Sequence, residues 1–103
     1  MSIRLSNDSQ YARQEGDTHW WSWTAYVQCT PPDSLSEIAY VEYHLHPSFR
    51  NPVVRVKTRE GGFPLNRIGW GVFELRAKVV FKDKKRKPLF LSHYLEFEGA
   101  GFD

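Results

Sequence analysis

The chain has 103 residues, 41% of them hydrophobic and 25% charged, which is usual for a globular protein and enough for one domain, expected to span residues 1–103. A formal net charge of only +2 argues against a dedicated nucleic-acid-binding protein, whose basic excess is usually larger. The single cysteine excludes an internal disulfide framework, and neither a signal peptide nor an apolar run of transmembrane length is evident, so we expect a soluble, cytoplasmic protein without a membrane partner.

Alternation of apolar and polar residues predicts β-strands along most of the chain. The clearest case is the segment 20–28, in which Trp21, Trp23, Ala25 and Val27 would face the core while the residues between them face solvent. No segment has apolar residues at helical spacing over three turns. The expected strands, in chain order, are 3–6, 20–28, 38–45, 53–57, 63–65, 72–82 and 89–97.

These short strands, each with one apolar face, predict an all-β fold, namely an immunoglobulin-like β-sandwich of about seven to eight antiparallel strands. If successive strands alternate in direction, the loops 46–52 and 66–71 lie at the same end of the sandwich. His19, just before the segment 20–28, lies at that end as well. The basic turn 83–88 then lies at the opposite end.

Both loops carry aromatic residues where polar residues would be expected. The first contains His46-Pro47-Ser48-Phe49, and the second contains Gly69-Trp70-Gly71-Val72-Phe73. In one interpretation, Phe49 and Trp70 plug the open end of the sandwich. In the other, they form two facing walls of a binding pocket, with the Ser48 hydroxyl between them.

These motifs, together with Trp21-Ser22-Trp23, resemble the YEATS domain family, and the Trp-rich segment is most similar to its prokaryotic branch. The resemblance covers about residues 19–97. It implies an immunoglobulin-like sandwich that binds acylated lysine, of acetyl or crotonyl type, between aromatic rings at the loop end. The chain would then be a non-enzymatic binding module that needs no cofactor, and its partner would be a peptide or protein bearing acyl-lysine.

The resemblance also implies roles for individual residues. Phe49 and Trp70 would sandwich the acyl-amide, the Ser48 hydroxyl would bond the amide, and the Trp70 backbone N–H would bond the acyl carbonyl. Each ring stack is worth about 0.5–1.5 kcal/mol beyond burial, and the polar partners avoid the cost of an unpaired amide. The implied acyl-lysine-binding residues are His19, His46, Ser48, Phe49, Gly69, Trp70, Gly71 and Phe73.

Three other chemistries fit the same residues less well. Aromatic walls can enclose a methylated lysine, but neither loop contains Asp or Glu, and Arg50 adds positive charge. His44 and His46 have a spacing that could suit a metal, yet no third ligand is in register with them, so no metal site is expected. Ser48 paired with His46 or His19 would lack the carboxylate that orients a catalytic histidine.

Two further interpretations concern partners. A protein–protein adaptor in a prokaryotic signalling or conflict system would use the same aromatic loops as interaction hot spots. The basic run 82–87, with Lys84, Lys85 and Arg86, is typical of a solvated hairpin turn that also protects strand edges. Its alternative, a phosphate- or nucleic-acid-binding patch, would form a second site far from the aromatic loops.

Overall fold

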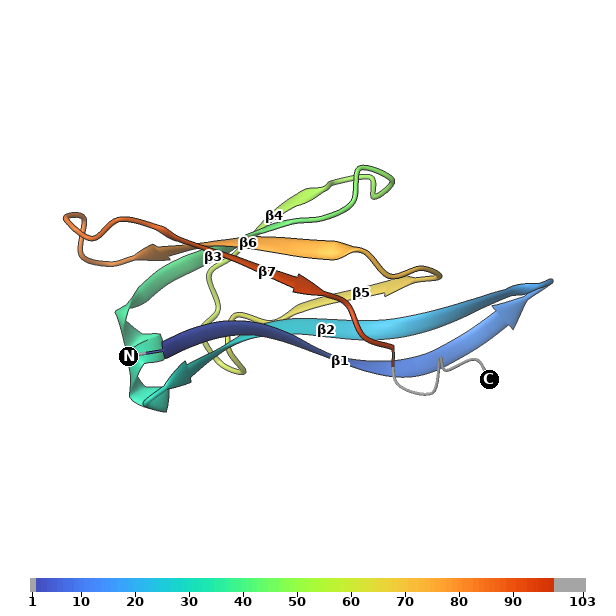
Figure 1. Ribbon diagram of the computed structural model, residues 1–103, viewed down its shortest axis with the longest axis horizontal. Coiled ribbons are helices and arrows are strands. Elements are labelled where there is room, and N and C mark those ends of the chain that lie inside the picture. The colour runs from blue at the N-terminus through green and yellow to red at the C-terminus, as the bar shows by residue number, and fades with distance from the viewer. Residues whose placement is uncertain (1, 98–103) are drawn as a thin grey trace.

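Two antiparallel sheets packed face to face make up the computed structural model, which describes residues 2–97 (Figure 1). One sheet has the strand order β1-β2-β5, and the other has the order β4-β3-β6-β7. The all-β sandwich expected from the sequence is therefore confirmed. Its elements are β1 (Ser2–Glu15), β2 (Thr18–Thr30), the 3-10 helix η1 (Pro32–Glu37), β3 (Ile38–His44), β4 (Val53–Val56), β5 (Leu65–Gly69), β6 (Glu74–Phe81) and β7 (Leu89–Tyr94).

The core lies between the sheets and is built mainly from the inward faces of β2, β3 and β6. Alternate residues point to opposite faces of a strand, so the alternation in the sequence becomes one buried and one exposed face per strand. Burial of each large apolar side chain contributes about 1.5–3 kcal/mol. The residues exposed by 2% or less on these strands are Trp23, Ala25, Val27, Ile38, Val41, Tyr43, Leu75, Ala77 and Val79.

Strand boundaries differ from the expectation at two places that matter for the site. β1 continues from the expected segment 3–6 to Glu15, and the β1–β2 hairpin extends beyond the other sheet (Figure 1). Residues 7–15 are largely polar, so no apolar alternation marks them, and backbone pairing with β2 forms the strand instead. The strand expected at 63–65 is Leu65–Gly69, so the second aromatic loop begins only at Trp70.

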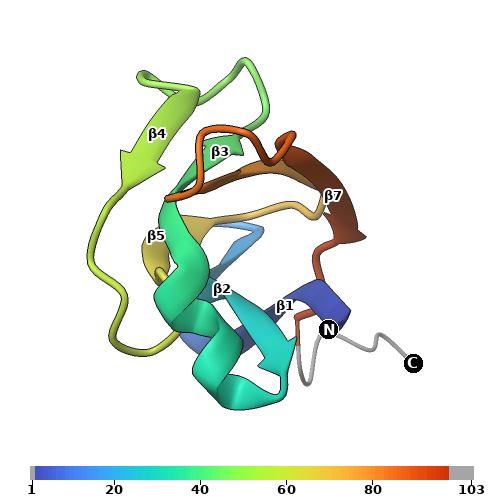
Figure 2. The ribbon, with the colours of Figure 1, turned by 90° about the vertical axis from the view of Figure 1, so that its left-hand side faces the viewer.

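A short helix that the sequence did not reveal lies at one end of the sandwich. η1 follows β2 and lies opposite the end at which the β1–β2 hairpin projects (Figures 1 and 2). Pro32 at its first turn is compatible with a helix start, and Ser34 is buried. Six residues are too few for a helical apolar period to be recognised. Among residues 2–97, no helix has the length and apolar character needed to cross a membrane.

The segment between β4 and β5 is fastened to both sheets by hydrogen bonds. The Val27 N–H on β2 donates to the Gly62 carbonyl at 2.8 Å. The buried Tyr43 hydroxyl on β3 donates to the Phe63 carbonyl at 2.6 Å, and burial raises the pKa of Tyr43 above its ordinary value. Gly62 has φ +87°, and a Cβ at this position would clash with the Val27 carbonyl oxygen. This glycine is therefore required both by its backbone conformation and by the close approach of β2.

We predict that Gly62→Ala lowers the free energy of unfolding by more than about 3 kcal/mol, because backbone strain and a clash with β2 add together. Gly16→Ala is the matched control, since Gly16 also has a positive φ but a Cβ added there would have no atom within 4 Å. In the Gly16→Ala variant the free energy of unfolding should fall by about 1 kcal/mol, from backbone strain alone. Urea unfolding monitored by tryptophan fluorescence measures the free energy of unfolding of both variants. Equal decreases in the two variants would contradict the role assigned to the clash.

Candidate functional site

A pocket of about 410 Å³ lies between the β3–β4 loop and the β5–β6 loop. Both loops lie at the end of the sandwich opposite η1 (Figure 1). The structure thus brings together the two aromatic motifs that lie about twenty residues apart in the sequence. The lining residues are Trp20, His46, Ser48, Phe49, Arg50, Ile68, Gly69, Trp70, Gly71, Val72 and Phe73.

The inner wall of this pocket is supported by Trp23, a β2 residue that is only 1% exposed. Phe49 packs perpendicular to the Trp23 ring, with ring centroids 6.4 Å apart and an interplanar angle of 89°. Phe73 packs at 6.0 Å and 72° on the same indole, and it also contacts Phe49 at 5.7 Å. Such edge-to-face contacts are favourable aromatic geometries. One buried indole therefore positions a residue from each loop.

The two aromatic residues expected to form the walls differ in burial. Phe49 is half-buried and packs against the core cluster, so it partly fulfils the interpretation as a plug. Trp70 is 65% exposed, so it does not fill the interior. Both rings line the pocket, and Phe49 makes its ring contacts with Trp23 and Phe73.

A hydrogen-bond pair within the first loop orients the Ser48 hydroxyl. The Ser48 backbone N–H donates to His46 Nδ1 at 3.1 Å, so this nitrogen acts as an acceptor and carries no proton. The Ser48 Oγ lies 2.8 Å from the same Nδ1, and its hydroxyl therefore donates to it. The oxygen lone pairs of Ser48 remain able to accept a hydrogen bond from another group.

His19 is not among the pocket-lining residues; its neighbour Trp20 lines the pocket instead. Successive residues of β2 point to opposite faces, so His19 and Trp20 lie on different faces of the sheet. His19 shares the face of Trp21, and its Nδ1 lies 3.0 Å from the Tyr11 hydroxyl on the β1–β2 hairpin. The alternation of β2 puts His19 on the inner face with Trp21 and Trp23, so it gave no signal that Trp20, on the outer face, would line the pocket.

The charged group on the pocket lining is Arg50, and the lining contains no carboxylate. The two histidines whose spacing could suit a metal have separate partners. His44 lies 2.9 Å from Glu42 on the outer face of β3, whereas His46 pairs with Ser48. An Arg55 hydrogen bond to Glu42 lowers the pKa of that carboxyl. Within residues 2–97, no cluster of three or more candidate metal ligands occurs.

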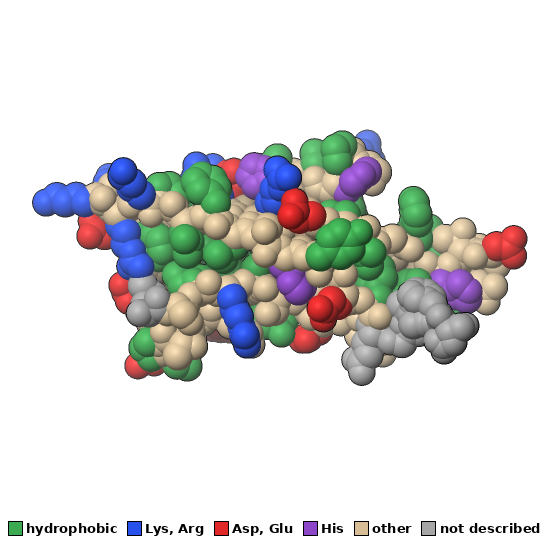
Figure 3. Space-filling model, in the orientation of Figure 1, with side chains coloured by type: hydrophobic (Ala, Val, Ile, Leu, Met, Phe, Trp, Pro, Cys, Tyr) green, Lys and Arg blue, Asp and Glu red, His purple; other side chains and the backbone are tan. Residues whose placement is uncertain are grey.

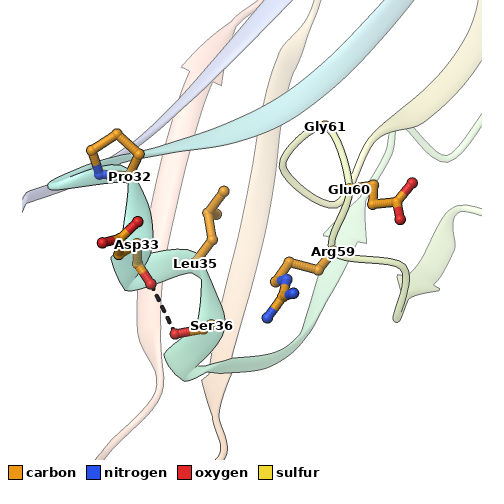
Figure 4. Close-up of a pocket in the computed structure, with 7 residues that line it drawn as sticks. All are labelled: Pro32, Asp33, Leu35, Ser36, Arg59, Glu60 and Gly61. Atoms are coloured by element: carbon orange, nitrogen blue, oxygen red, sulfur yellow. Dashed lines mark hydrogen bonds between the residues drawn. The ribbon is translucent and has the colours of Figure 1, made fainter.

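A second pocket, of about 390 Å³, lies at the η1 end of the sandwich and contains none of the expected site residues (Figure 4). Figure 4 shows the Arg59 side chain directed toward η1, while the Glu60 side chain points away from it. The Ser36 hydroxyl is used within η1, where it donates to the Asp33 carbonyl at 2.8 Å. The lining has no aromatic ring on which a planar group could stack, so the loop-end pocket is the stronger candidate.

The basic turn lies between β6 and β7, on the side of the molecule away from the aromatic pocket. Figure 3 shows Lys and Arg side chains projecting from that end. Arg86 forms an ion pair with Glu37 at 3.0 Å, and its guanidinium lies 3.7 Å from the centroid of the Phe81 ring. The turn is therefore tied to η1 and β6 rather than to the pocket.

Comparison with known proteins gives matches along most of the chain. Residues 21–96 match the model of the prokaryotic YEATS domain. The chain is 34% identical over 80 residues to transcription initiation factor TFIID subunit 14 of Schizosaccharomyces pombe, covering 74% of this chain and 32% of that protein. It is 35% identical over 79 residues to protein AF-9 homolog of Eremothecium gossypii, covering 75% of this chain and 37% of that protein. The chain thus spans about a third of the length of these relatives.

Solved structures resemble the fold at 24% sequence identity. The crystal structure of yeast AF-9 homolog protein Yaf9 has a TM-score of 0.75, covering 96% of this chain and 70% of that chain. The Yaf9 YEATS domain bound to H3K27ac has a TM-score of 0.74, and the match covers 94% of this chain and 74% of that chain. The Yaf9 YEATS domain recognizing an H3K122suc peptide has a TM-score of 0.70, and the match covers 94% of this chain and 75% of that chain. These neighbours confirm the expected immunoglobulin-like β-sandwich.

We predict that the two aromatic walls contribute unequally to stability. Phe49→Ala should lower the free energy of unfolding by about 2 kcal/mol, because it removes packing against Trp23 and Phe73. Trp70→Ala should change it by no more than about 0.5 kcal/mol, because the side chain is mostly exposed. Thermal and urea unfolding measure both, and a large loss in Trp70→Ala would show that this ring belongs to the core.

Proposed function

The chain belongs to the prokaryotic YEATS domain family, and from this we propose that it is a non-enzymatic, cytoplasmic module that binds acylated lysine in the loop-end pocket. The observation that carries the proposal is the convergence of Phe49, Trp70 and Ser48 on one cavity of about 410 Å³. The partner would be a peptide or protein bearing acyl-lysine. The Yaf9 YEATS domain described as bound to H3K27ac supports this choice of ligand.

The pocket offers a suitable partner for each part of an acyl-lysine amide. The flat amide would lie between the rings of Phe49 and Trp70, where stacking is favourable. The amide N–H would donate to the Ser48 oxygen, whose own proton is held by His46. The Trp70 backbone N–H would donate to the acyl carbonyl, and His46 and Phe73 would line the acyl end. Both polar groups of the amide would then be paired, which avoids the cost of burying them unsatisfied.

Glycines on both sides of Trp70 would let the ligand approach the backbone. A Cβ added at Gly71 would have no atom within 4 Å, so the loop is open at this point. Gly69 is buried at the end of β5 and faces the Phe49 ring. A ligand of this size is expected to bind with a Kd of roughly micromolar to millimolar, because association entropy offsets much of the contact energy.

A protein–protein adaptor is the second candidate function, and exposed apolar residues around the pocket favour it. Ile68 is 39% exposed and Val72 is 43% exposed, and both line the pocket beside Trp70. An exposed aromatic with apolar neighbours is typical of an interaction hot spot. Nucleic acid is not part of either proposal, since Lys84, Lys85 and Arg86 lie at the far end of the sandwich.

Ser48→Ala distinguishes the two candidate functions. For acyl-lysine binding, we predict that Ser48→Ala and Trp70→Ala each raise the Kd of an acetyl-lysine peptide about tenfold or more, because the amide needs both the hydrogen bond and the ring. Ser92→Ala, on the exposed face of β7, is the matched control and should leave the Kd unchanged. Isothermal titration calorimetry gives these values. An adaptor would be weakened by Trp70→Ala and unaffected by Ser48→Ala.

We also predict that an acetyl-lysine peptide binds more tightly than the matched trimethyl-lysine peptide. The pocket lining contains Arg50 and no carboxylate, so a cationic side chain gains nothing to offset its lost hydration. Fluorescence anisotropy with the two labelled peptides, and with unmodified lysine as a control, measures the difference. Tightest binding of the trimethylated peptide would contradict the proposed ligand class.

A further inference from the structure

The strand β7 is an edge strand without the usual protection against pairing with another chain. Figure 2 shows β7 and β4 at opposite margins of the four-stranded sheet. Natural edge strands are commonly protected by charged residues, prolines or bulges. The other edge strands, β1, β4 and β5, each contain arginine, whereas β7 contains no Lys, Arg, Asp or Glu. Its outward side chains Phe90 and Tyr94 are 72% and 62% exposed, so this edge is apolar and open.

The β6–β7 register shows which backbone groups of β7 point to the open edge. Leu95 lies opposite Phe73, and its N–H donates to the Phe73 carbonyl at 3.1 Å. Opposite residues of an antiparallel ladder alternate between hydrogen-bonded and non-hydrogen-bonded pairs. Every second residue back from Leu95 therefore bonds to β6. The residues between them, Phe90, Ser92 and Tyr94, direct their N–H and C=O groups away from β6, toward the open edge.

This open edge has a defined end on each side. Glu96, two residues beyond Tyr94, also directs its backbone groups away from β6, and the Asn7 side chain of β1 bonds both of them. Asn7 Nδ2 donates to the Glu96 carbonyl at 2.9 Å, and its Oδ1 accepts the Glu96 N–H at 3.0 Å. At the other end, Pro88 has no N–H to offer. Three residues between a proline and an already bonded glutamate are thus available for pairing.

We propose that β7 pairs antiparallel with β7 of a second copy of this chain, about a twofold axis at Ser92. Ser92 lies opposite Ser92 of the second copy, and Phe90 lies opposite Tyr94 of the second copy. All three available residues then exchange backbone hydrogen bonds across the axis. The side chains of Phe90 and Tyr94 form two cross-strand aromatic pairs on the outer face, which stabilise the contact.

The self-complementarity of this register is the reason for choosing a second copy as the partner. A twofold contact requires the same surface to fit itself, and the two aromatic residues lie at equal distances on either side of Ser92. An axis one residue earlier would place Tyr94 opposite Pro88, which lacks an N–H. An axis one residue later would place Phe90 opposite Glu96, whose backbone groups already bond β1. Only the axis at Ser92 uses the whole open edge.

Analytical ultracentrifugation over a concentration series tests the proposal. The wild type should dimerise reversibly with a Kd of roughly 10–100 μM, because a contact centred on one strand edge is small. Ser92→Pro removes an N–H that β6 does not use, so this variant should fold and raise the dimer Kd about tenfold or more. Ser92→Ala is the matched control: it keeps the N–H and should leave the Kd unchanged.

Single cysteines test the register. Ser92→Cys should give disulfide-linked dimers under mild oxidation, because the Cα atoms of a hydrogen-bonded pair lie about 5.5 Å apart, within reach of a disulfide. Phe90→Cys and Tyr94→Cys should each fail to crosslink alone but should crosslink when mixed. The wild type, in which Cys29 is buried, is the control for other crosslinks.

If Ser92→Pro does not fold, the cysteine variants decide the result. The proposal would be overturned by a wild type that remains monomeric up to about 500 μM, well above the expected Kd. It would also be overturned by a Ser92→Pro variant that dimerises like the wild type, or by Phe90→Cys crosslinking to itself. A monomer in which the Ser92 amide exchanges slowly with solvent would show that another segment covers the edge, and would likewise overturn it.

Discussion

The contact of Trp23 with Phe49 and Phe73 is the interaction on which the pocket depends. Trp23 belongs to the β1-β2-β5 sheet, Phe49 lies in a loop of the other sheet, and Phe73 lies in the loop that connects the two sheets. One core side chain therefore sets the relative position of both loops. Because Trp23 is fully packed, its rotamer is fixed, and the inner wall is formed before any ligand arrives.

The two proposed aromatic walls combine rigidity with access. Phe49 is held by the core, so in the proposed complex it would lose little conformational freedom on stacking with a ligand. Trp70 is exposed between two glycines, which would let it adjust to ligands of different thickness. A change in the core near Trp23 would therefore act on binding through Phe49, whereas a change at Trp70 would act on binding with little effect on stability.

The sequence predicted the sandwich and the two aromatic loops because strong alternation marks β2 and β6. It could not predict the full length of β1, since residues 7–15 are polar and form a strand only by pairing with β2. Trp23 was correctly predicted to be buried. The close approach of Gly69 to the Trp23 indole depends on the β2–β5 register, which pairs Trp21 with Gly69 and cannot be read from either segment alone.

The polar groups around the pocket have an order that would fix the direction of a bound amide. His46 Nδ1 accepts a hydrogen bond from the Ser48 backbone N–H, so the Ser48 hydroxyl donates to His46 and its oxygen lone pairs would be available to accept from a ligand. In the proposed complex the amide N–H must then face Ser48, so its carbonyl faces Trp70 and the acyl chain points toward Phe73 and Gly69. The Ser48 oxygen would then lie at the lysine side of the amide. The charge of a free ammonium group would meet Arg50 on the pocket lining rather than a carboxylate.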